Sequence, residues 1–152
     1  MTKVIGRSSV IFLMAALMTV VGTAAYVFWP LPSTDDMRAY FSSHRDALER
    51  ANASTLRQIA EGKSPATSGN AEAGYLSVRV AGWPKPSRVE YKTHTWGFGF
   101  ATVGTGIAYV LAPPDKSYPT LEAARGEPNK GDSFRGLVPL GGNWYAMYWQ
   151  LD

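Results

Sequence analysis

A long apolar run opens the chain, and the residues behind it show alternating apolar and polar positions. The run extends from Val10 to Trp29, and no charged side chain occurs between Ser8 and Thr34. As a helix, this run would be about 30 Å long, which matches the hydrocarbon core of a bilayer. The pattern therefore predicts a transmembrane anchor at residues 10–29.

The charges on either side of the run predict its orientation. Lys3 and Arg7 precede it, whereas Asp35 and Asp36 follow it. Basic residues next to a membrane span are retained in the cytoplasm. The sequence thus predicts a cytoplasmic N-terminus (residues 1–9), a span of the bacterial inner membrane in contact with lipid (residues 10–29) and a periplasmic domain (residues 33–152).

A cleaved signal peptide is the alternative interpretation of this run. Thr23, Ala24 and Ala25 are the small residues that a signal peptidase accepts. Hydrophobic residues resume directly afterwards, between Tyr26 and Trp29, which favours a retained anchor.

The segment after the apolar run has the periodicity of an amphipathic helix. Pro30 and Pro32 separate it from the anchor, Ser33 is the expected N-cap and Gly62 is the expected stop. Its apolar stripe recurs at spacings of three to five residues. The stripe contains Met37, Tyr40, Phe41, His44, Leu48, Ala51, Leu56 and Ile59.

Period-two alternation dominates after residue 74 and predicts strands. The expected strands are residues 76–80, 89–93, 98–103, 107–112, 134–140 and 143–151. Gly104-Thr105-Gly106 is expected to be a hairpin connection, and a short helix at residues 121–125 is expected between Thr120 and Gly126. The expected fold is α+β, with one amphipathic helix packed on an antiparallel meander sheet of about six strands.

The last hairpin determines which aromatic rings are buried. If Gly141-Gly142 is a two-residue turn, one face contains Phe134, Val138, Leu140, Tyr145, Met147, Trp149 and Leu151, and the other contains Arg135, Leu137, Pro139, Trp144, Ala146, Tyr148 and Gln150. The first set is apolar and is expected to pack under the helix. A shift of one residue would exchange the two sets.

Trp144, Tyr148 and Arg135 are then a candidate contact patch on the exposed face. Aromatic rings and arginine concentrate binding energy at interfaces. The structural alternative is that the two rings simply cover Leu137 and Pro139, with Arg135 stacked on Tyr148.

Composition excludes several classes of function. Without Lys3 and Arg7, 13 of the 15 Lys and Arg remain against 12 Asp and Glu, and they form no basic cluster. Nucleic acid is therefore not an expected partner. The chain has no Cys, so it cannot carry a disulfide or a lipobox cysteine.

Chemical sites are also scarce. With no Cys and only two His, we expect no metal site, no cofactor and no catalytic site. His44 lies on the apolar stripe and is interpreted as structural. His94 lies in an expected turn and is the only candidate general base. The glycine pairs around Phe98 and Thr105 are not followed by a helix, which excludes a nucleotide loop.

Several short motifs resemble a group of small proteobacterial envelope proteins. They are Phe41-Ser42-Ser43-His44-Arg45, Gly106-Ile107-Ala108-Tyr109 with the following Pro113-Pro114, and Gly142-Asn143-Trp144-Tyr145. The resemblance covers about residues 37–151 and implies an envelope location and this architecture, but no activity. The chain differs from the group's lipoproteins because it lacks a lipobox cysteine, which favours the transmembrane anchor.

These observations favour a non-catalytic, membrane-anchored periplasmic domain that acts through protein–protein contact. It would be an immunity or exclusion factor, or an accessory subunit of a membrane complex, with a partner that the sequence does not identify. The alternatives are a cell-wall glycan-binding domain that uses its aromatic rings, and a small hydrolase that uses His94.

Overall fold

The computed structural model describes residues 31–65, 68–82, 84–98, 101–128 and 133–151. The predicted anchor at residues 10–29 and the N-terminal segment lie outside these ranges. Across the residues that are described, no helix is long and apolar enough to cross a bilayer.

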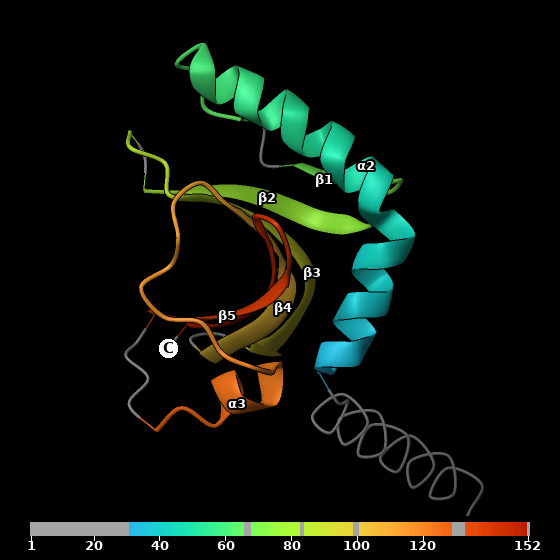
Figure 1. The fold of residues 1–152 in the computed structure, drawn as a ribbon, viewed down its shortest axis with the longest axis vertical. Helices are drawn as coiled ribbons and strands as arrows, with labels where there is room; N and C mark the ends of the chain where they lie inside the picture. Colours follow the sequence, from blue (N-terminus) through green and yellow to red (C-terminus); the bar gives the residue numbers. More distant parts are fainter. Residues whose placement is uncertain (1–30, 66–67, 83, 99–100, 129–132, 152) are drawn as a thin grey trace, which may run out of the picture. The chain divides into compact units, whose positions relative to one another are not determined.

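The chain folds as one long helix on an antiparallel sheet of six strands, so the α+β class is confirmed (Figure 1). The helices are α2 (Thr34–Ala60) and α3 (Leu121–Arg125). The strands are β1 (Ser68–Asn70), β2 (Tyr75–Ala81), β3 (Arg88–Phe98), β4 (Ala101–Val110), β5 (Ser133–Gly141) and β6 (Trp144–Leu151). Their order is β1-β2-β3-β4-β6-β5. The sheet is thus not a pure meander, because β6 pairs with β4 and leaves β5 at the edge.

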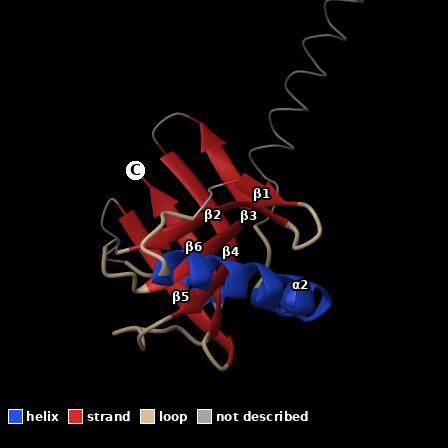
Figure 2. Ribbon diagram, turned by 90° about the horizontal axis from the view of Figure 1, so that it is seen from above, coloured by secondary structure: helices blue, strands red, loops and turns tan. Residues whose placement is uncertain are grey.

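The ends of α2 follow from local side-chain chemistry, as the sequence predicts. Ser33 is the N-cap and forms a capping box with Asp36, in which each side chain bonds the other residue's backbone N–H. The helix ends at Ala60, and Gly62 has a φ of +71°. Its apolar face is buried at Met37 and Leu48. Figure 2 shows α2 lying along one side of the sheet.

A buried hydrogen bond fixes α2 to the sheet. The Tyr91 hydroxyl on β3 donates to Oδ1 of Asn52, with 3.0 Å between the oxygens. Burial raises the pKa of Tyr91, so the hydroxyl stays protonated and remains a donor. This bond lies within the main core, where α2 and α3 pack on the same face of the sheet.

The short helix α3 joins the beginning of α2. Thr120 caps it and Gly126 ends it, as predicted. The Thr34 hydroxyl donates to Glu122 at 2.9 Å and accepts from the Leu121 N–H at 2.7 Å. The first turn of α2 is therefore connected to α3 by a continuous set of hydrogen bonds.

The glycine pair at residues 104 and 106 does not form a hairpin connection, and that prediction is wrong. Both glycines lie in the middle of β4, where Gly104 pairs with Trp149 of β6. A Cβ atom at Gly104 would lie 2.5 Å from Cζ2 of Trp149 and would also overlap the His94 carbonyl. The glycine is needed because the indole ring lies directly against the backbone at this point.

The last hairpin has a register one residue away from the predicted one. Gly141 lies opposite Trp144 and Pro139 lies opposite Tyr145, whereas a Gly141-Gly142 turn would place Pro139 opposite Trp144; the pairing is irregular between Pro139 and Gly141. Gly142 then supplies a positive φ of +56° as the first residue of the turn. Val138 of β5 faces the helices, as expected. Because of the extra residue in β5, the β6 side chains that were expected on the exposed face lie under the helices, and those expected under the helices lie on the opposite face.

Adding a methyl group at Gly104 should destabilise the protein. We expect Gly104→Ala to lower the free energy of unfolding by about 1–3 kcal/mol, because Trp149 and the β3 backbone have no room to move. Urea unfolding of the full-length protein in detergent measures this. Gly126→Ala is the matched control, since its Cβ would meet nothing closer than 3.5 Å and its φ of −77° suits alanine. Equal stability of the two variants would contradict the role of Gly104.

Candidate functional site

The predicted contact patch is not formed, because its aromatic members are in the core. Trp144 is 6% exposed and Tyr148 is 4% exposed, and both lie under the helices. The Trp144 ring packs against Phe41 of α2 with centroids 5.4 Å apart. Arg135 lies on the opposite face of the sheet. The one-residue shift in register is the cause, and it also removes Trp144 as a ring that could stack on an external sugar.

His94 lies in β3 and not in a turn, so that expectation was also wrong. Its Nδ1 atom is 3.0 Å from the hydroxyl of Thr93, which itself donates to the Thr105 carbonyl at 3.1 Å. Burial lowers the pKa of His94. No Asp or Glu of the described ranges contacts its ring. The hydroxyl proton of Thr93 is thus directed to a backbone carbonyl, which disfavours a nucleophile–base pair.

His44 is half-buried on α2, as expected for a structural residue. Its ring stacks on Tyr40 with centroids 4.3 Å apart. Its Nδ1 atom lies 2.9 Å from the Ser43 hydroxyl.

A charged cluster occupies the face of the sheet opposite the helices, and Glu90 is at its centre. Glu90 is only 1% exposed. Arg88 donates from Nε to its Oε1 at 2.8 Å, and Nε of Arg135 lies 3.6 Å from the same oxygen. The second distance is that of an ion pair and is too long for a hydrogen bond. Arg79 pairs with Glu90 across β2 and β3, which adds a third basic residue.

The contact between Arg135 and Glu90 requires a strongly curved sheet. Arg135 is on β5 and Glu90 is on β3, and strands β4 and β6 lie between them. On a flat sheet, three strand spacings would separate them by about 14 Å. The face opposite the helices must therefore be concave. Figure 1 shows the strands curling, with α2 following their outer side.

Small residues on β4 make room on this concave face. Gly104, Gly106 and Ala108 lie between the charged side chains of β3 and the large side chains of β6. The Trp149 ring fills the space over Gly104, and Nζ of Lys92 lies 4.3 Å from the centre of a Trp149 ring. This is a cation–π contact, and it holds the lysine over the sheet.

Basic groups exceed acidic groups in the cluster. Burial is the main cause that lowers the pKa of both Lys92 and Arg135; Glu90 opposes this effect, and neighbouring arginines add to it. Three buried polar atoms in the cluster have no hydrogen-bond partner in the structure: Glu90 Oε2, Arg135 Nε and Trp149 Nε1. Such atoms are uncommon in folded proteins and call for an explanation.

A pocket of about 340 Å³ opens beside this cluster. Arg88 and Arg135 line it together with Val110, Leu137 and a segment of the connection that follows β4. The full lining is Ser87, Arg88, Val110, Ala112, Pro113, Pro114, Asp115, Lys116, Arg135 and Leu137. Two guanidinium groups beside apolar walls can bind an anionic group that carries an alkyl chain. We call this the concave-face pocket.

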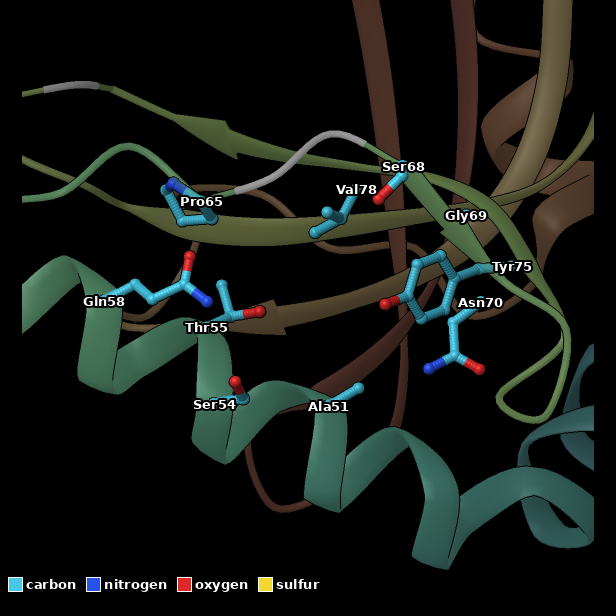
Figure 3. Close-up of a pocket in the computed structure, with 10 residues that line it drawn as sticks. All are labelled: Ala51, Ser54, Thr55, Gln58, Pro65, Ser68, Gly69, Asn70, Tyr75 and Val78. Carbon is cyan, nitrogen blue, oxygen red and sulfur yellow. The ribbon is translucent and has the colours of Figure 1, made fainter.

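A second hollow, of about 220 Å³, lies between α2 and the strands β1 and β2 (Figure 3). Its lining contains no charged side chain. Hydroxyl and amide groups from Ser54, Gln58 and Asn70 line it beside the Tyr75 ring. This lining suits a neutral polar ligand.

Comparison of the chain with protein-family models, curated proteins and solved structures gave no match. The resemblance to envelope proteins stays a prediction from short motifs.

The alternation along β2 and β3 places their charged residues on one face, and charged residues in such a pattern are normally solvated. Glu90 is buried because Arg135 reaches it from β5. The available signal was the pair of glycines inside β4, because strand glycines mark a close approach of side chains.

Neutralising Glu90 should destabilise the fold. We expect Glu90→Gln to lower the free energy of unfolding by about 3 kcal/mol, because the buried guanidinium groups lose their counter-ion. Glu49→Gln is the matched control: its ion pair with Arg45 is exposed, and its loss should cost less than about 0.5 kcal/mol. Urea unfolding of the full-length protein in detergent compares them. If both variants lost the same small amount, Glu90 would not hold the cluster together.

Proposed function

We propose that this chain is a membrane-anchored periplasmic domain that binds a protein partner through the concave-face pocket and does not act as an enzyme. The observation that carries the proposal is the convergence of Arg88 and Arg135, from two different strands, beside a pocket with apolar walls. Arginine is enriched at protein interfaces because it combines charge, directional hydrogen bonds and contact area. An immunity or exclusion factor and an accessory subunit of a membrane complex both fit this mode of action.

The sequence of the first residues supports the membrane location. An uncharged apolar run between basic and acidic flanks is typical of a signal-anchor with its N-terminus in the cytoplasm. The anchor would hold the domain at the outer face of the inner membrane, where a small binding domain meets its partner at high local concentration.

A glycan-binding domain is the second candidate, and the hollow of Figure 3 favours it. Its neutral hydroxyl and amide groups can bond sugar hydroxyls, and Tyr75 offers a ring beside them. We favour the concave-face pocket over this hollow as the binding site, because its charge and shape restrict the ligand more strongly.

Cysteine labelling tests the location. The chain has no Cys, so Ser42→Cys on the exposed side of α2 introduces a single thiol. We expect a membrane-impermeant maleimide to label this variant in cells with a permeabilised outer membrane. Thr2→Cys is the control and should be labelled only after the inner membrane is broken. The reverse pattern would contradict the proposed orientation. The mass of the purified protein shows whether residues 10–29 are retained.

Photo-crosslinking in cells tests the partner. Leu111 is 39% exposed and directly precedes Ala112 of the pocket lining. We expect p-benzoylphenylalanine at Leu111 to give a discrete protein adduct that is lost when Arg88→Lys is added. The same amino acid at Ala53, on the exposed side of α2, is the control and should give no such adduct. An adduct from Leu111 that is insensitive to Arg88, or no adduct at all, would count against a partner in this pocket.

A further inference from the structure

The donors that remain on the two arginines define what the concave-face pocket can hold. Arg88 gives its Nε to Glu90 and Arg135 gives one Nη to the backbone carbonyls of Phe134 and Gln150. Among the described groups, none accepts a hydrogen bond from either Nη of Arg88 or from the second Nη of Arg135. Three Nη groups, each with two N–H donors, therefore remain beside the pocket, enough for the two oxygens of one carboxylate.

The charge balance favours a singly charged group. Arg88 and Arg135 share one carboxylate, Glu90, and Arg79 and Lys92 add further positive charge to the cluster, so basic groups exceed acidic groups beside the pocket. Lys116 in the pocket wall is paired with Glu127, whereas Asp115 adds a negative charge to the wall. Asp115 repels an anion in proportion to its charge, so it disfavours a doubly charged phosphate more than a singly charged carboxylate.

The remaining walls are apolar. Val110 and Leu137 lie on the sheet, and Pro113 and Pro114 belong to the connection after β4. A volume of about 340 Å³ is near the lower limit for ligand sites, so it suits one or two residues of a chain end and not a folded element.

We propose that the concave-face pocket binds the C-terminal carboxylate of a polypeptide whose last side chain is apolar. The carboxylate contacts Arg88 and Arg135, and the last side chain packs on Val110 and Leu137. This inference rests on the proposed function, because it names the part of the partner that enters the pocket. Capture of a chain terminus by a few fixed donors is an established mode of peptide recognition.

Titration of the isotope-labelled full-length protein in detergent micelles tests the proposal by NMR. The probes are N-acetyl-Ala-Leu-Leu with a free carboxylate, the same peptide as its C-terminal amide, 4-methylpentanoate and inorganic phosphate. The signals are the Nε–Hε groups of Arg88 and Arg135 and the amide of Ala112. We expect the free acid to bind, and the amide to bind at least about tenfold more weakly because it lacks the charge.

Three variants separate binding from folding. Arg88→Lys keeps the charge but loses the planar donor pair, and should weaken binding of the free-acid peptide by about tenfold. Ala112→Glu adds a negative charge to the exposed wall of the pocket and should also weaken binding of the free-acid peptide. Ala112→Gln is the matched control. Arg57→Lys, on the exposed side of α2, should leave binding unchanged. An unchanged pattern of amide signals confirms that each variant is folded.

Several outcomes would overturn the inference. Equal binding of acid and amide would exclude carboxylate recognition, and tighter binding of phosphate would show a different anion site. If 4-methylpentanoate bound as tightly as the peptide, the occupant would be a free small carboxylate. If none of the probes bound, chain-end capture would be wrong. The crosslink at Leu111 is independent of all these results, so the proposed protein contact can survive the failure of this inference.

Discussion

The buried carboxylate of Glu90 is the constraint on which the rest of this structure depends. A buried carboxylate is costly unless cationic groups pair with it, and one of those groups, Arg135, comes from a strand three positions away in the sheet. That approach requires a curved sheet, and the curved sheet requires a strand without bulky side chains on its inner face. The glycines of β4 meet this requirement. Charge pairing, curvature and glycine placement are therefore parts of a single arrangement.

The features that the sequence predicts correctly are those that neighbouring residues determine. Ser33 and Asp36 cap α2 within one turn, and Thr120 and Gly126 bound α3 in the same way. The last hairpin is different, because consecutive Gly141, Gly142 and Asn143 allow two placements of a two-residue loop. In the structure, Gly142 and Asn143 form the loop, and the extra residue produces the irregular pairing between Pro139 and Gly141 of β5. Nothing in the local pattern distinguishes the two placements, yet the choice decides whether Trp144 or Trp149 lies under the helices.

The candidate site was only partly predictable for a related reason. Alternation along β2 and β3 places Arg79, Arg88 and Glu90 on one face, and this much is a local property. The burial of Glu90 depends on Arg135, which comes from the far edge of the sheet, and the periodicity of β2 and β3 contains no information about that contact. An alternating strand of charged residues is normally solvated. Here the same pattern of charged residues lies on the concave face of a curved sheet.

The two faces of the sheet differ in the charge that they bury, and this difference is the reason to assign binding to the concave one. Under the helices, the buried hydroxyl of Tyr91 has its partner in Asn52, and the aromatic rings pack on one another. A buried atom without a hydrogen-bond partner among the described residues occurs on both faces, at Thr105 Oγ1 under the helices and at Glu90 Oε2 on the concave face. The concave face differs because it buries a carboxylate together with the guanidinium group of Arg135. Replacing buried charges by apolar residues often stabilises a protein, so stability alone does not explain why they are retained. The charged groups of the concave face cost stability and border a pocket, so their retention is better explained by a ligand that binds to them. The helix-facing core accounts for the fold.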